Sequence, residues 1–202
     1  PPRSTLFPYT TLFRSVHEED AGAYWAYYDE WGITHHRPKP DGLYYSIVQS
    51  PLDRPELSAD DIRAYALPDF SDPVRIEGLR ELALEYREAG YAVVLKDPFA
   101  GLFEMAQRIL GMERCLIMMA SEKLLVGVLF DRLLELKLSF WTMALPRLAD
   151  VVDVVTYADD YGTQLSQLIS PRMFREQLKP RLKELFACMA RLAPHADRKS
   201  TR

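Results

Sequence analysis

The spacing of apolar residues along the chain predicts several amphipathic helices. Between residues 72 and 90, apolar side chains recur at intervals of three and four, which places them on one face of a helix: Leu79, Leu82, Ala83 and Tyr86. Pro73 suits the first turn of this helix and Gly90 its end. Similar patterns predict helices over residues 17–28, 58–66, 101–110 and 121–145, and from residue 170 onward.

Three stretches have the composition of strands instead. Residues 43–48 are rich in aromatic and β-branched side chains, whereas residues 91–95 and 151–157 are mostly apolar. Apolar runs without alternation suit parallel strands that are covered on both faces. The order strand, helices, strand, helix therefore predicts an α/β fold with a parallel sheet, and periodicity alone leaves open whether that sheet is open or closed into a barrel.

Both ends of the chain lack the periodicity of the elements beside them. Residues 3–7 and 10–15 form a near-repeat, and the tail at residues 198–202 is basic and polar. Both segments resemble translated sequencing adapter. We therefore expect residues 1–15 to be foreign and disordered, residues 198–202 to be foreign, and residues 16–197 to be an internal fragment of a longer protein. A native basic N-terminal arm is the alternative.

Composition and charge narrow the class of protein. The chain has 202 residues, of which 48% are hydrophobic, and a net charge of −4 without a basic cluster, which argues against nucleic acid as a partner. Its longest strongly apolar run, residues 124–130, is far shorter than the roughly 20 residues of a membrane-spanning helix. Cys115 and Cys188 form no Cys-x-x-Cys motif, so we expect no disulfide framework, no metal site and a cytoplasmic location.

The strongest candidate site follows the second apolar strand. Asp159 and Asp160 come directly after it, at the carboxyl end of a parallel strand, where α/β folds place their active sites. Crowding of two carboxylates raises one pKa, which suits proton donation. We predict catalytic roles for both acids, and substrate contacts for Tyr161 and Gln164 in the same loop. A solvated Asx-type turn is the alternative.

A second candidate site lies nearer the N-terminus. Asp29 and Trp31 precede Arg37, whose guanidinium could hold a substrate carboxylate, so we predict a catalytic Asp29 and substrate contacts from the other two. The alternative, a helix end with a packed tryptophan, is favoured by spacing alone. Glu104, in the first turn of the helix after the first apolar strand, is predicted to reach the substrate or to stabilise the helix end.

These segments together resemble a known family. Residues 152–164, with Asp-Asp-Tyr-Gly-Thr-Gln at their end, resemble a late strand and loop of the uroporphyrinogen decarboxylase family. Further segments fit the same family: 28–32, 67–69, 96–104, 169–175 and 179–183. The resemblance covers nearly all of residues 16–197 and implies a (β/α)8 TIM barrel. That barrel would be incomplete in this chain, because about 250 residues are typical.

The resemblance implies a cofactor-free carboxy-lyase of porphyrin biosynthesis, which decarboxylates a porphyrinogen-like small molecule. Asp29 matches the family's aspartate that binds pyrrole N–H groups. The family carries a catalytic tyrosine where this chain has Glu104, and a serine near Asp159, which argues against uroporphyrinogen itself as the substrate. A chain truncated in this way is expected to be inactive alone.

Two alternatives accompany this interpretation. The same family includes zinc-dependent methyltransferases that act with a cobalamin (corrinoid) protein. Their zinc would come from a His-x-Cys motif and a further cysteine, which would lie beyond Asp197. The second alternative is a non-catalytic barrel that serves as a binding module. The expected partners are a small-molecule substrate, a second copy of the chain in a homodimer and, for the methyltransferase, the corrinoid protein, with no membrane partner.

Overall fold

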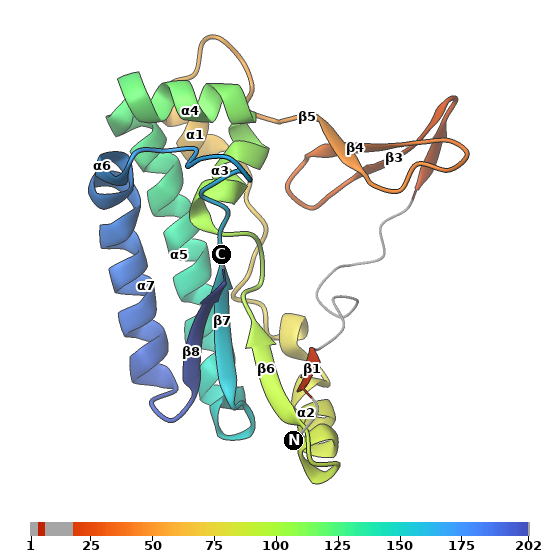
Figure 1. Ribbon diagram of the computed structural model, residues 1–202, viewed down its shortest axis with the longest axis vertical. Coiled ribbons are helices and arrows are strands. Elements are labelled where there is room, and N and C mark those ends of the chain that lie inside the picture. The colour runs from red at the N-terminus through yellow and green to blue at the C-terminus, as the bar shows by residue number, and fades with distance from the viewer. Residues whose placement is uncertain (1–3, 7–17, 202) are drawn as a thin grey trace.

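The computed structural model describes residues 4–6 and 18–201 and contains two separate sheets (Figure 1). One sheet has the strand order β1-β6-β7-β8 and the other β2-β3-β4-β5. The helices η2 and η3 are 3-10 helices and η4 is a π-helix. In chain order the elements are β1 (Ser4–Leu6), β2 (Glu19–Ala21), β3 (Tyr24–Tyr28), β4 (Thr34–Pro38), β5 (Ser46–Gln49), α1 (Ala59–Ala64), η2 (Pro73–Ile76), α2 (Leu79–Glu88), β6 (Ala92–Lys96), α3 (Leu102–Leu110), α4 (Met112–Ser121), α5 (Lys123–Leu148), η3 (Ala149–Val151), β7 (Val154–Ala158), α6 (Pro171–Met173), η4 (Phe174–Leu178), α7 (Lys179–Leu192) and β8 (Asp197–Thr201).

The parallel sheet is centred on the two apolar strands that the sequence predicted. Strands β6 and β7 pair in parallel, with Leu95 opposite Val155, and α3, α4 and α5 form the connection between them. Alternate residues of both strands are buried and their neighbours half-buried, so one face of the sheet is covered more completely than the other. Helices α5 and α7 pack together along the sheet (Figure 1).

The antiparallel sheet stands out from the helical body (Figure 1). It replaces the helix expected over residues 17–28, and that prediction is wrong for the described part, residues 18–28. Gly22, with φ of 69°, forms the turn between β2 and β3, and its N–H donates to Asp20 at 2.9 Å. Aromatic side chains then alternate between the two faces of β3, a composition that favours a strand over a helix.

The (β/α)8 barrel is wrong. Among the described residues, both sheets are open, and strands β2 to β5 pair with their chain neighbours in antiparallel fashion. Short connections of this kind cannot link parallel strands, each of which needs a crossover of a dozen or more residues. Among the described residues, only the segment from β6 to β8 alternates parallel strands with helices, and a barrel repeats this unit eight times.

The ends of the helices agree with the sequence in part. Ser58 and Asp61 form a capping box at the start of α1, within the helix predicted over residues 58–66: the Asp61 N–H donates to the Ser58 Oγ at 3.1 Å and the Ser58 N–H to Asp61 at 2.8 Å. Helix α5 continues through Pro146, beyond the end predicted at residue 145. None of the described helices is long and apolar enough to cross a lipid bilayer.

The expected foreign ends fall partly on described strands. Strand β1, within residues 1–15, pairs in parallel with β6, and the rest of those fifteen positions lie outside the described residues. Strand β8 runs across the expected boundary after Asp197 and pairs in parallel with β7. Residue 202 also lies outside the described residues.

Candidate functional site

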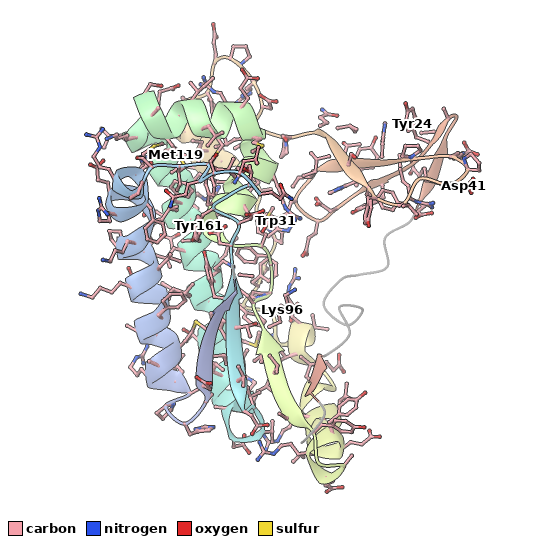
Figure 2. All side chains as sticks on the ribbon, viewed as in Figure 1. Tyr24, Trp31, Asp41, Lys96, Met119 and Tyr161 are labelled. Carbon is pink, nitrogen blue, oxygen red and sulfur yellow. The ribbon has the colours of Figure 1, made fainter. Side chains whose placement is uncertain are left out.

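A cavity of about 310 Å³ lies at the carboxyl ends of β6 and β7, the position at which parallel sheets hold their ligands. In Figure 2, Trp31 and Lys96 lie beside the upper ends of these strands. We call this space the inner cavity. Its walls come from the loop after β3, the segment after β6, helix α3 and the end of β7: Asp29, Glu30, Trp31, Lys96, Asp97, Phe99, Ala100, Glu104, Met105, Arg108 and Ala158.

Asp97 joins this cavity to a fully buried lysine. The Lys137 Nζ donates to Asp97 Oδ2 at 2.6 Å and to the Phe99 carbonyl oxygen at 3.2 Å, and it lies 3.8 Å from the centre of the Phe99 ring. The side chain of Asp97 is 3% exposed and that of Lys137 is 0% exposed, so the ion pair is shielded from water. The second carboxylate oxygen, Oδ1, is buried without a hydrogen-bond partner.

Burial dominates the protonation of both groups. It raises the pKa of Asp97 to about 6, against the attraction of the Lys137 ammonium, which favours the ionised form. Burial likewise lowers the pKa of Lys137, against the attraction of Asp97. A carboxyl with a pKa of about 6 is partly protonated near neutral pH, which suits a general acid or base.

Sequence reasoning missed this pair, although the chain contained signals for both members. Asp97 directly follows the first apolar strand, just as Asp159 follows the second. Lys137 lies three or four residues from Leu133, Leu134, Phe140 and Trp141, all of which are buried. A lysine on the apolar face of a helix is a candidate for a buried, partnered charge.

Asp159 occupies the predicted position at the end of β7, and its carboxylate binds the start of α3. It accepts the N–H of Phe103 at 3.0 Å, the N–H of Glu104 at 2.8 Å and the hydroxyl of Tyr157 at 2.7 Å. A carboxylate at a helix N-terminus satisfies free N–H groups and interacts favourably with the helix dipole. Asp159 thus joins β7 to α3, and its predicted catalytic role stays a prediction.

The contact between Asp159 and α3 leaves no room for a side chain at Gly101. A Cβ atom at Gly101 would lie 2.0 Å from the Asp159 carboxylate carbon. The Tyr157 hydroxyl accepts the N–H of Leu102 at 3.0 Å. The first turn of α3 is therefore held against β7 by buried hydrogen bonds, and this fixes the position of Glu104 at the cavity.

Asp29 and Trp31 reach the inner cavity from the turn between β3 and β4. Asp29 Oδ1 accepts the N–H groups of Trp31 and Ile33, both at 2.9 Å, and Oδ2 lies 2.9 Å from His35 Nε2. The Trp31 side chain is 4% exposed and packs against Phe99 with ring centres 4.9 Å apart. The predicted residues Asp29, Trp31 and Glu104 therefore do meet at one site.

The remaining predicted site residues lie outside the lining of the inner cavity. Arg37, on β4, lies 3.6 Å from Glu18 and above the ring of Tyr45. Asp160 and Gln164 are exposed, so Asp160 is not crowded into the buried environment of Asp159. Tyr161 stacks on Phe103, with ring centres 5.9 Å apart, and burial raises its pKa.

Metal ligands and thiols add no further site in the described part of the chain. Residues 4–6 and 18–201 contain no group of three or more His, Cys, Asp or Glu side chains that could hold a metal ion. Cys115 and Cys188 are free and buried. Burial raises the pKa of the Cys115 thiol to about 12, so this thiol stays protonated at neutral pH.

Comparison with known proteins gives no match to a protein-family model, a curated protein or a solved structure. The fold and the inner cavity therefore define the class of protein only as a mixed α/β protein with a candidate acid–base site.

Proposed function

We propose that this protein is an enzyme that acts on a small carboxylated molecule, with Asp97 as the proton donor and Lys137 as the partner that limits how far burial raises the pKa of Asp97. One observation carries the proposal: a buried carboxyl lines a cavity while one of its oxygens pairs with a buried ammonium and the other has no partner. A buried carboxylate oxygen left without a partner is costly, and such groups cluster at functional sites.

The reaction class we propose is decarboxylation, which the resemblance to the uroporphyrinogen decarboxylase family suggests. The bond between the substrate's carboxylate carbon and its neighbour breaks, CO₂ leaves, and the electron pair stays on the neighbouring carbon. That carbon then takes the proton of the Asp97 carboxyl, which solvent replaces. With a pKa of about 6, the carboxyl is protonated in a useful fraction of molecules near neutral pH.

The chain itself is suitable for testing this proposal. Its expected inactivity rested on missing barrel strands, and the barrel is wrong. The two acid–base residues and the cavity walls all lie within the described residues 29–158. A cytoplasmic location belongs to the same proposal, supported by the free thiols of Cys115 and Cys188.

The test is release of CO₂ by the purified chain in D₂O from a panel of β-keto acids, malonates and heteroaromatic acetic acids. The product should carry deuterium at the carbon that lost CO₂. Asp97→Asn should abolish turnover, because an amide cannot supply the proton. Asp60→Asn changes a carboxylate on a side chain that is 92% exposed, and it should have no effect.

The pH profile tests the role of Lys137. Turnover should fall as the pH rises above about 6, because the protonated form of Asp97 is the donor. Lys137→Met should move this fall to higher pH, because the ammonium lowers the pKa of Asp97. Full activity of Asp97→Asn, or binding of panel compounds without any turnover, would contradict the proposal, and the second result would favour a binding module.

A further inference from the structure

A second, larger cavity adjoins the inner cavity. It has a volume of about 590 Å³ and lies between one wall formed by β5 with the segment that follows it and another formed by α3 with the start of α4. We call it the outer groove. Its walls are formed by Ile47, Val48, Gln49, Ser50, Pro51, Asp53, Glu104, Gln107, Arg108, Gly111 and Met112. Glu104 and Arg108 line both spaces, so these two side chains form the wall between them.

Glu104 and Arg108 form an ion pair with each other, and breaking this ion pair costs little free energy. The Arg108 Nη2 donates to Glu104 Oε1 at 2.5 Å across one turn of α3. Both side chains are substantially exposed, at 41% for Arg108 and 31% for Glu104, and ion pairs of this kind contribute at most about 1 kcal/mol. A guanidinium offers five donors in a planar fork, and among the described residues that of Arg108 hydrogen-bonds only to Glu104.

The other acids of the inner cavity are held by basic partners outside its lining. Asp29 pairs with His35, and Asp97 pairs with Lys137. Glu30 accepts two hydrogen bonds from the guanidinium of Arg75, at 3.1 and 2.6 Å. Arg108 therefore differs from these bases, because it lies on the cavity wall itself and its only hydrogen-bond partner among the described residues is the partly exposed Glu104.

We infer that Arg108 leaves Glu104 to bind a carboxylate of an elongated ligand, which extends from the inner cavity into the outer groove. This inference rests on the proposed function, because it places the reacting end of the ligand beside Asp97. The inner cavity alone is at the lower limit of ligand pockets, which span about 300–1,000 Å³, and the outer groove adds the space for a longer molecule. Arg108 is then the residue that selects substrates with a second carboxylate distant from the one that is lost.

Calorimetric titration of the full chain with straight-chain dicarboxylates, from malonate to suberate, tests this inference. The longer dicarboxylates should bind more tightly than monocarboxylates of the same length. Arg108→Gln should weaken their binding about tenfold, the loss expected for one charge-assisted hydrogen bond. Glu104→Gln should strengthen it, because Glu104 competes with the ligand for the same guanidinium.

The opposite signs of these two effects separate ligand exchange from a structural ion pair. Arg172→Gln is the matched control, since Arg172 lies one helical turn from its partner Glu176, and it should leave binding unchanged. Equal weakening by both substitutions, no dependence on ligand length, or no binding of any dicarboxylate would overturn the inference.

Turnover distinguishes this failure from failure of the proposed function. If Asp97-dependent CO₂ release persists with the same KM in Arg108→Gln, the inference fails and the proposed function stands. If Arg108-dependent binding is seen without CO₂ release from any compound of the panel, the proposed decarboxylation fails and the binding role of Arg108 stands.

Discussion

Replacement of Lys137 by methionine should destabilise the protein by an amount that grows with pH. The substitution keeps an unbranched apolar stem and removes the ammonium 2.6 Å from Asp97, which leaves a buried carboxyl without its partner. Loss of one member of a buried pair costs about 3–5 kcal/mol. The folded variant can avoid this buried unpaired charge by keeping Asp97 protonated, since buried acids without a partner reach pKa values of about 8–9.

The pH dependence follows from the pKa values. The pKa of Asp97 is higher in the folded state than its value of 3.8 in the unfolded state. The folded protein therefore loses stability as the pH rises, until Asp97 also ionises in the folded state. In the wild type this loss ends at about pH 6, because Lys137 lets Asp97 ionise there. In Lys137→Met it continues at about 1.4 kcal/mol per pH unit. The difference in unfolding free energy between wild type and variant should therefore be about 2 kcal/mol larger at pH 8 than at pH 6.

Urea unfolding at both pH values, followed by tryptophan fluorescence and circular dichroism, measures this difference. The double variant Asp97→Asn/Lys137→Met has no titrating group at this position, and its destabilisation should not change between pH 6 and pH 8. Lys123→Met removes an exposed lysine 2.8 Å from Glu176, and it should cost less than about 1 kcal/mol at either pH. A destabilisation by Lys137→Met that is the same at both pH values would refute the reasoning.

Three further predictions concern the packing around the site. Asp159→Asn should lower the unfolding free energy by about 1.5–3 kcal/mol in urea unfolding, because the amide group offers one acceptor to the two N–H groups at the start of α3. An unchanged unfolding midpoint would contradict this role of Asp159. Gly101→Ala should lower the unfolding free energy by at least about 1–3 kcal/mol in the same assay, because its Cβ would overlap the Asp159 carboxylate. Gly127→Ala is the control and should not show this loss, because its Cβ meets only the end of the Arg181 side chain, at 3.5 Å. Cys115 should react with a maleimide reagent at pH 8 only after unfolding, as judged by mass spectrometry, and rapid labelling of the native protein would show that this thiol is not buried.

Local rules were reliable wherever neighbouring residues decide the structure. The capping box at Ser58 depends on residues three positions apart, and the end of α2 depends on Gly90, whose φ is 84°. The two apolar strands and the carboxylate after β7 also follow from short stretches of sequence. In these cases the interacting groups lie within one turn or one strand, so the pattern carries the information.

Residues 18–28 form a structure that neighbouring residues do not decide, and the helix predicted there is wrong. The aromatic composition of β3 favours a strand, and its pairing with β2 and β4 supplies the hydrogen bonds that a strand needs. Strand formation depends on partners, because the hydrogen bonds of a strand go to other strands. For the same reason the sequence could not distinguish an open sheet from the closed barrel suggested by the resemblance.

The amino-acid sequence by itself determined the start of α1, the end of α2, the two central parallel strands and the presence of an acid at the end of β7. Only the tertiary structure decided what those residues do. It brought Lys137 to Asp97 across 40 positions, buried both, and used Asp159 to hold α3. Burial and distant partners set the protonation of these groups, and neither is encoded in the spacing of residues along the chain.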